Sequence, residues 1–415
     1  MQTHEFILWE RRRRVKEPWM TEKWHLTYLN FLPEVRREFD FADEVLISDC
    51  TLREGEQQAG VVLSPRDKLE LAKGLDEVGI PQLEVGMPAV SQEEFENIKM
   101  IAKSGLNAKT IALCRITKTD IDKALECKTW GVSISIPIGY LQIKHKLKWS
   151  EEKIINEVTD VTQYAHRNGF YVVLSPYDTT RADLPFLERF LKAVIREGHA
   201  DRVRVVDTVG SALPQAIGYM VKWMLKVTHL PVEVHCHDDF GMATANTLAG
   251  IAAGASVAST VLNGMGERAG GAPTEEVALA LYLLYGLDLG LKYEKFYSLG
   301  KLLQEMSGVR LAPNKAVVGE NAFGQEAGMV VSGWKEMVFT AEPYLPELVG
   351  HSHRLILGKK SGKDSVELKL QEMGRKVRKD QLEVLVQRVK RHAETTKRPL
   401  SDEDFRKILD ELTGT

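Results

Sequence analysis

Cysteine is scarce in this sequence. The 415 residues include four cysteines, at positions 50, 114, 127 and 236, and no two of them have CxxC spacing. They are too few and too scattered for a disulfide framework or a CxxC zinc site. The chain also lacks an excess of charge of either sign, since 55 Lys and Arg residues face 58 Asp and Glu residues, a formal net charge of −3. This balance gives no reason to expect nucleic acid or an acidic membrane surface as a partner.

Long hydrophobic runs are missing as well. No apolar run approaches the roughly 18 residues that are needed to cross a bilayer. The basic run at residues 11–14 is not followed by the apolar segment of a signal peptide. We interpret this run as solvated surface or a helix end, with phosphate binding as the less favoured alternative. The sequence therefore predicts a cytoplasmic protein without a membrane partner.

What is present is a regular alternation of short apolar, β-branched runs with longer amphipathic segments. Two of the amphipathic segments, 64–79 and 91–105, open with serine before an acidic first turn and close on glycine, as capped helices do. The strands are expected near residues 44–50, 82–86, 109–114, 132–137, 170–176, 202–208, 232–237 and 256–263. Eight strands that alternate with helices predict parallel βα units.

The architecture that best fits this alternation is a (β/α)8 TIM barrel. A doubly wound sheet would normally use fewer strands and carry a GxGxxG fingerprint after the first one, and "DCTLREGEQQAG" (49–60) has none. A barrel of about 250 residues with additions also suits a chain of this length. We divide the chain into an N-terminal arm (1–42), a catalytic barrel (43–290) and a small, mostly helical post-barrel extension (291–415).

The stretch "EVHCHDDF" (233–240) places two histidines at the end of the seventh expected strand. Residues i and i+2 of a strand point to the same face, so His235 and His237 should both project into the barrel mouth while Cys236 faces the helices. Two imidazoles with a carboxylate from a neighbouring strand end form a site for a divalent ion that leaves positions open for a chelating substrate. In an arbitrary HxH, hydrogen-bonded core histidines are commoner, but the barrel and the acidic loop after strand one favour the metal site.

Four motifs, each at the end of an expected strand, together resemble one known family. They are "DCTLREGEQ" (49–57), "VDTVG" (206–210), "HCHDDFGMATANT" (235–247) and "NGMGERAGG" (263–271). In this order they are similar to the metal-dependent Claisen-condensing barrels, which include 2-isopropylmalate, homocitrate and citramalate synthases, with the hydroxymethylglutaryl-CoA lyases as relatives. The resemblance spans roughly residues 44–370, and "HDDFGMATANTLAG" (237–250) is most similar to homocitrate synthases of the nitrogen-fixation type.

The resemblance implies a role for each residue at the strand ends. Glu54, His235 and His237 would bind a divalent metal (Mg, Mn, Zn or Co), and Arg53 would polarise the 2-oxo group and stabilise the developing alkoxide. The substrate-binding set would comprise Gln57, Glu84, Arg115 and Thr208. The implied substrates are a small 2-oxo acid and an acyl-CoA, acetyl-CoA in the synthases. The implied assembly is a homodimer in which the post-barrel segment of one chain reaches the active site of the other.

The sequence departs from the family pattern in three places. In "GENAFGQEAGMVV" (319–331), Gln325 and Val330 stand where the synthases carry histidines, and the second of those histidines belongs to the machinery that enolises acetyl-CoA. Tyr177 stands where the loop after strand five usually has Glu, and we name it as a catalytic candidate. Gly271 replaces an Asn of the isopropylmalate branch. The other candidates for the missing proton-transfer group are His145, His351 and His353.

Three functions are therefore considered. The leading one is a metal-dependent acyltransferase that condenses acetyl-CoA with a 2-oxo acid. The second is a lyase or aldolase that cleaves a 2-hydroxy acid or its CoA ester on the same metal site; the absence of any cysteine after Cys236, and thus of a "GCP" lid, counts against the CoA-ester lyases. The third is a barrel that binds metal without catalysis.

Overall fold

The computed structural model describes residues 17–414. The basic run at 11–14 lies outside the described residues. The chain divides into two compact units, one formed by Leu29–Arg310 and the other by residues 17–28 together with 311–414. The division into an N-terminal arm, a barrel and an extension stays a prediction, because the two compact units have different boundaries.

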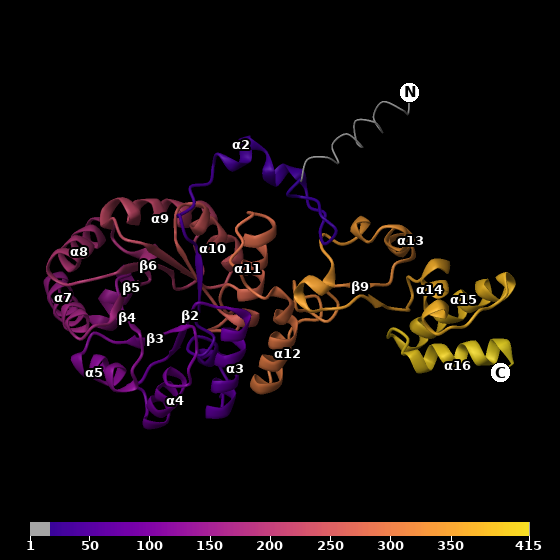
Figure 1. The fold of residues 1–415 in the computed structure, drawn as a ribbon, viewed down its shortest axis with the longest axis horizontal. Helices are drawn as coiled ribbons and strands as arrows, with labels where there is room; N and C mark the ends of the chain where they lie inside the picture. Colours follow the sequence, from indigo (N-terminus) through magenta and orange to yellow (C-terminus); the bar gives the residue numbers. More distant parts are fainter. Residues whose placement is uncertain (1–16, 415) are drawn as a thin grey trace. The chain divides into compact units, whose positions relative to one another are not determined.

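The first unit is built on a closed barrel of parallel strands in the order β1 to β8. The (β/α)8 fold that the sequence predicts is confirmed (Figure 1). The strands are β1 (Leu46–Asp49), β2 (Gln82–Gly86), β3 (Lys109–Cys114), β4 (Gly131–Pro137), β5 (Tyr171–Tyr177), β6 (Arg202–Asp207), β7 (Val232–Cys236) and β8 (Val257–Thr260). Because helices cover the outside and side chains fill the inside, strand residues on both faces are buried.

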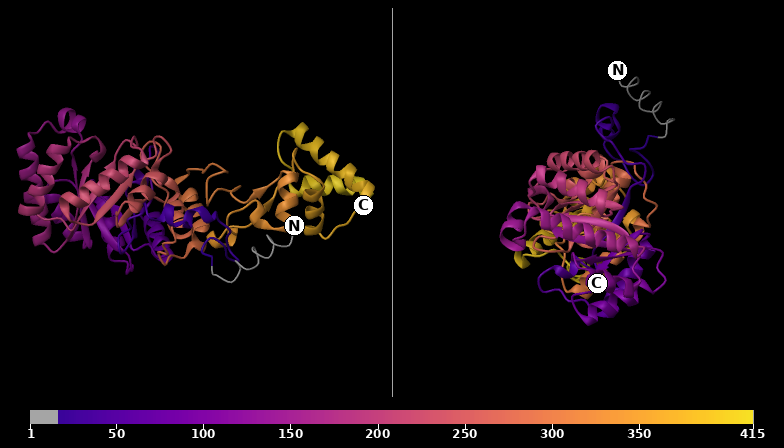
Figure 2. Two further views of the ribbon diagram at one scale, coloured as in Figure 1. Left: turned by 90° about the horizontal axis from the view of Figure 1, so that it is seen from above. Right: turned by 90° about the vertical axis from the view of Figure 1, so that its left-hand side faces the viewer.

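The helices between the strands lie on the outside of the barrel in every view (Figures 1 and 2). They are α3 (Pro65–Val78), α4 (Gln92–Ala102), α5 (Lys118–Cys127), α7 (Glu151–Arg167), α8 (Leu184–Glu197), α9 (Pro214–Thr228), α10 (Ala243–Ala252) and α11 (Thr274–Leu283), followed by α12 (Phe296–Ser307). The sequence predicts the start and end of α3: Ser64 forms a capping box with Asp67, and Gly79 closes the helix in the left-handed region with φ 100°.

Part of the N-terminal segment packs on the barrel. The guanidinium of Arg36 in α2 (Pro33–Arg36) donates to the carbonyl of Tyr285 at 2.6 Å, and the ring centroid of Phe39 lies 5.1 Å from that of Tyr285. The amide of Asp40 donates to the carbonyl of Ala252 at the end of α10. Residues 29–42 thus belong to the barrel unit.

The second unit is mostly helical at its C-terminal end. It contains α13 (Gly328–Glu336), α14 (Lys363–Glu372), α15 (Lys379–Thr396), α16 (Asp402–Thr413) and a two-stranded sheet of β9 (Gly324–Gln325) and β10 (Arg354–Leu355). Helices α14 to α16 share an apolar core around Val366, Leu385 and Phe405. Residues 17–28 join this unit through backbone contacts of Lys23, Trp24 and His25 with 343–345. Among the described residues, none of the helices combines the length and apolar character that spanning a bilayer requires.

Candidate metal centre and the charges around it

Glu54, His235 and His237 meet at the C-terminal end of the barrel. His235 lies on β7, His237 follows it, and Glu54 lies in the turn after β1. Nε2 of His237 lies 3.1 Å from Oε1 of Glu54, and Nε2 of His235 lies 3.9 Å from Oε2. All three side chains are buried, and one ligand atom from each lies within 4.8 Å of the others. The structure therefore brings together the three residues predicted to bind metal.

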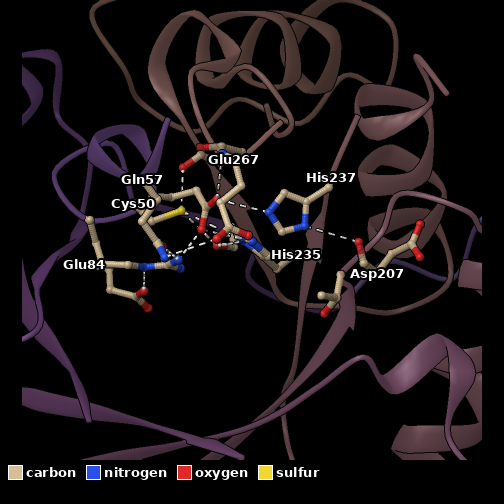
Figure 3. A network of polar contacts seen from close by, with 12 residues as sticks. Cys50, Gln57, Glu84, Asp207, His235, His237 and Glu267 are labelled. Carbon is tan, nitrogen blue, oxygen red and sulfur yellow. Dashed lines mark hydrogen bonds and ion pairs between the residues drawn. The ribbon is translucent and has the colours of Figure 1, made fainter. Parts of the chain in front are cut away.

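Each imidazole is oriented by a contact of its other nitrogen. Nδ1 of His235 lies 2.9 Å from the hydroxyl of Ser259 on β8, and Nδ1 of His237 lies 3.4 Å from the carbonyl oxygen of Asp207 at the end of β6. Both rings consequently turn Nε2 toward Glu54, and both belong to the network of polar contacts in Figure 3. Burial, and next the neighbouring His237, hold the pKa of His235 well below its ordinary value, so this ring is neutral at neutral pH.

The contact partners of His237 test whether a cation fits this site. A carbonyl oxygen only accepts hydrogen bonds, so Nδ1 of His237 must carry the proton in its contact with Asp207. With the Nδ1 proton in that contact, Nε2 can turn a lone pair toward the carboxylate of Glu54, 3.1 Å away, and a cation between the two atoms would be bound by both. Two imidazoles and one carboxylate are a donor set that divalent transition metals accept.

Arg53 lies beside this centre and is held on two sides by carboxylates. Its Nη1 contacts Oε2 of Glu54 and donates to Oε1 of Gln57 at 2.9 Å, while its Nε donates to Oε1 of Glu84 at 2.6 Å. Burial alone would lower the pKa of Arg53, but Glu84 and Glu54 raise it above its ordinary value. The guanidinium is therefore a fixed positive charge directly beside the predicted metal ligand Glu54.

Glu84 connects Arg53 to a chain of buried charges inside the barrel. Its second oxygen, Oε2, accepts from Nη2 of Arg204 at 2.8 Å. Burial disfavours the charge of Glu84, yet Arg204 and Arg53 lower the pKa of this carboxyl to about 2. The predicted substrate-binding residue Glu84 is fully buried, and its carboxylate accepts a hydrogen bond from Nε of Arg53.

The chain of charges continues toward the N-terminal end of the strands. Nη2 of Arg204 also lies 2.8 Å from Oε1 of Glu233, whose Oε2 lies 2.8 Å from Nε of Arg202. Arg202 in turn donates to Gln82 at 2.9 Å. Sequence reasoning missed this array, although a signal exists. In "RVR" (202–204) and "EVH" (233–235) polar residues stand two positions apart, as residues facing a barrel interior would.

The loop after β8 adds two further residues that sequence reasoning did not single out. The amide of Glu267 donates to Oε1 of Glu54 at 3.2 Å, and its carboxylate accepts from Gln57 at 3.5 Å. Arg268 forms a bidentate pair with Asp239 and donates to the carbonyl of Thr208 at 2.7 Å. The motif "NGMGERAGG" carries both residues, so the resemblance pointed to this loop without assigning them.

The remaining sequence-predicted residues lie apart from the three ligands to different degrees. The hydroxyl of Thr208 accepts from the amide of Asp178 at 2.7 Å, which ties the loop after β6 to the loop after β5. Tyr177 is the half-buried last residue of β5, and the ammonium of Lys146 lies 5.3 Å from its ring centroid. Arg115 is not part of the network: its side chain is 60% exposed and pairs with Asp120 on α5.

Comparison with known proteins matches this barrel to a described family. The family description HMGL-like covers residues 44–303, and a second, homocitrate synthase post-HMGL domain-like, covers residues 317–397. The chain belongs to the HMGL-like family. The family match contains β1 to β8 and every residue of the metal centre.

Two curated HMGL-like relatives and one solved structure illustrate the range of similar proteins. Homocitrate synthase AksA of Methanothermobacter thermautotrophicus is 41% identical over 91% of this chain and 96% of that protein. (R)-citramalate synthase CimA of Methanocaldococcus jannaschii is 43% identical over 89% of this chain and 75% of that protein. The crystal structure of HMG-CoA lyase of Bacillus subtilis covers 65% of this chain and 96% of its own with a TM-score of 0.59; at 19% identity this likeness concerns the fold alone.

In the post-HMGL region the structure also shows the residues that depart from the family pattern. The side-chain amide Nε2 of Gln325, on β9, donates to Oε1 of Glu342 at 3.2 Å. Oε2 of the same carboxylate lies 2.7 Å from Nε2 of His353. Val330 lies on α13 and is partly exposed. His351 is buried with Nε2 3.2 Å from the carbonyl of Gly319, whereas His145 lies in an exposed π-helical turn. Of these histidines, His353 has a buried carboxylate partner and an accessible edge.

Proposed function

We propose that this chain is a divalent-metal-dependent acyltransferase that condenses acetyl-CoA with a 2-oxo acid. The observation that carries the proposal is the buried set of Glu54, His235 and His237 with Arg53 beside it, in a chain similar over nine-tenths of its length to homocitrate synthase AksA. A site of this kind suits a substrate that chelates through a carboxylate and an adjacent carbonyl, because such a substrate fills the open metal positions.

The residues of this chain divide the work as follows. Glu54, His235 and His237 would hold Mg, Mn, Zn or Co, which when bound supplies Lewis-acid chemistry to the 2-oxo group. Arg53, fixed by Glu84, adds a positive charge where the carbonyl oxygen becomes negative. We assign Gln57 and Thr208 to the substrate carboxylate, and Arg115 to the outer part of the same set.

The reaction balances as a condensation followed by hydrolysis. A proton leaves the methyl group of acetyl-CoA, a carbon–carbon bond forms to the 2-oxo carbon, and the carbonyl oxygen takes up a proton to become a hydroxyl. Water then cleaves the thioester, and CoA leaves as the free thiol. Tyr177, at the end of β5, is our candidate for handling the methyl proton.

Acetyl-CoA and a 2-oxo acid should together release CoA from the metal-loaded protein. We expect release with at least one acid among 2-oxoglutarate, 2-oxoisovalerate, pyruvate and oxaloacetate, none without a 2-oxo acid, and a loss of about 1000-fold after chelation that added metal restores. The measurement is a thiol-release assay, run with and without each acid.

The lyase reading has one observation in its favour, which is Val330 in place of a proton-transferring histidine. Cleavage of a 2-hydroxy acid or its CoA ester, with no CoA release from acetyl-CoA and any 2-oxo acid, would replace the synthase proposal by this one. A protein that binds metal but performs neither reaction would be the non-catalytic barrel.

We also propose, from the family resemblance, that the chain forms a homodimer with post-barrel exchange. The partly exposed Val330 and the exposed Met329 of α13 lie in the segment that such an exchange would bring to the partner. Light scattering on the full chain measures the molar mass directly, and a mass of one chain at micromolar concentration would contradict the proposal.

A further inference from the structure

A cavity of about 320 Å³ opens beside Arg53, between the loop after β1 and the start of α4. This volume is at the lower end of small-molecule sites and gives room for a side chain of several carbons. Its lining comprises Arg53, Glu56, Gln57, Val62, Leu63, Met87, Val90, Ser91, Glu93, Glu94, Asn97 and Leu113. Arg53 and Gln57 belong both to this lining and to the network at the metal centre, so the cavity lies next to that centre.

The position of the cavity decides which part of a substrate can enter it. A 2-oxo acid that binds through its carboxylate and carbonyl beside Glu54 and Arg53 would leave its remaining substituent to extend into the space next to the guanidinium. Arg53 and Gln57, which contact each other at 2.9 Å, both line this cavity, so the cavity is an open space next to the guanidinium. The side chain of the 2-oxo acid is therefore its expected occupant.

The charged side chains in the cavity wall are either carboxylates or a cation that is already paired with carboxylates. Among the described residues that line the cavity, Arg53 is the one cation, and Glu54 and Glu84 already contact it. Behind the wall, the fully buried ammonium of Lys68 lies 2.5 Å from the carboxylates of both Glu56 and Glu94.

Two carboxylates thus share one ammonium, and the exposed Glu93 adds a third negative charge. Burial raises the pKa of Glu94 despite its contact with Lys68, which indicates that negative charge is already disfavoured in this wall. A further carboxylate here would be desolvated without a free cation to pair with it.

The close approach of Glu94 to the strand end depends on a glycine. Gly86, the last residue of β2, has φ +136°, and a Cβ built on it would lie 2.0 Å from Oε1 of Glu94. Any other residue would displace this carboxylate from the cavity wall. The negative wall is therefore part of the fold at this strand end.

The rest of the wall is apolar, formed by Val62, Leu63, Met87, Val90 and Leu113. We infer that the cavity beside Arg53 binds the side chain of the 2-oxo acid and selects an uncharged aliphatic chain against one that ends in a second carboxylate. This inference rests on the proposed function and narrows its substrate class to aliphatic 2-oxo monocarboxylic acids. 2-Oxoglutarate, which ends in a second carboxylate, falls outside this class.

Two acids with the same five-carbon chain test the selection. 2-Oxopentanoate and 2-oxoglutarate differ only in the terminal carboxylate, which is absent from the first. Isothermal titration calorimetry on the metal-loaded full chain should give a dissociation constant about 100-fold lower for 2-oxopentanoate. Equal affinities, tighter binding of 2-oxoglutarate or binding of neither acid would overturn the inference.

Variants of the wall sharpen the test. Glu94→Gln removes one negative charge, and Val90→Lys adds a cation at an exposed lining position. Each should reduce the ratio of the dissociation constants of 2-oxoglutarate and 2-oxopentanoate by about 10-fold. The matched control is Glu96→Gln on the same helix, an exposed residue outside the lining, which should leave the preference unchanged. Preferences that do not move in either wall variant would place the side chain elsewhere.

The same samples separate this inference from the proposed function. Binding of 2-oxopentanoate over 2-oxoglutarate without CoA release from acetyl-CoA would support the cavity and contradict the condensing reaction. CoA release that is fastest with 2-oxoglutarate would support the reaction and contradict the cavity.

Discussion

Glu54→Gln is expected to lower CoA release by about 1000-fold and metal affinity by about 100-fold or more. The amide keeps the volume of the carboxylate but removes the negative charge that both Nε2 atoms and Arg53 face. Without it, the three predicted ligands include no anion, and the positive charge of Arg53 is no longer balanced on the metal side. The measurements are metal content after dialysis and the rate of CoA release.

Glu77→Gln on α3 is the control for this substitution. Glu77 is an exposed carboxylate that pairs with Lys295, so its replacement should change neither metal content nor rate. A Glu54→Gln protein that retains full metal content and activity would show that Glu54 is not a ligand.

Arg204→Met is expected to lower the free energy of unfolding by about 3–5 kcal/mol. Arg204 is 2% exposed and contacts Glu84 and Glu233 at 2.8 Å each, so its loss leaves two buried carboxylates with one cation fewer. Burial disfavours the charge of Arg204, but Glu233 and Glu84 raise its pKa above the ordinary value, so the cation is present at every pH at which the protein folds. Denaturant unfolding followed by circular dichroism measures the change.

A surface substitution of the same type provides the comparison. Arg189→Met on α8 removes an arginine that pairs with Glu151 in solvent and should cost less than about 1 kcal/mol. The double variant Arg204→Met with Glu233→Gln should regain about 2 kcal/mol of the loss, because the second substitution removes the excess negative charge that the first leaves in the array. Equal costs for Arg204→Met and Arg189→Met would contradict the view that the array is a buried ion-pair network.

The fold could be predicted from the sequence because the barrel strands are apolar runs with clear boundaries. The segments at 82–86 and 109–114 coincide with β2 and β3. The eighth strand is the largest difference, since the expected 256–263 shortens to Val257–Thr260. Asn263 has φ 61° and its amide donates to Glu275 on α11, so the chain leaves the sheet early for a contact that no local pattern reveals.

The site could be predicted where sequence spacing determines geometry. The i, i+2 relation of His235 and His237 placed both rings on one face, and the structure brings Glu54 to them. Glu84, predicted to bind substrate, contacts Arg53, and its second partner, Arg204, comes from β6, more than a hundred residues away. Which arginine pairs with which carboxylate across a closed barrel depends on the stagger of the strands, which one sequence does not specify. The role of Arg115 stays a prediction, because its guanidinium donates to Asp120 in the first turn of α5, a local pairing that the strand pattern does not reveal.

The burial of the four cysteines has a practical consequence for assays with thiol reagents. All four are buried in the barrel unit, and burial raises the pKa of every one, that of Cys127 to about 11. A thiol that is both shielded and protonated reacts slowly with disulfide reagents. The folded protein should therefore contribute almost no colour of its own when such a reagent detects released CoA. Once the barrel opens, four reactive thiols per chain appear, so the same reagent, used without substrate, counts the opened barrels.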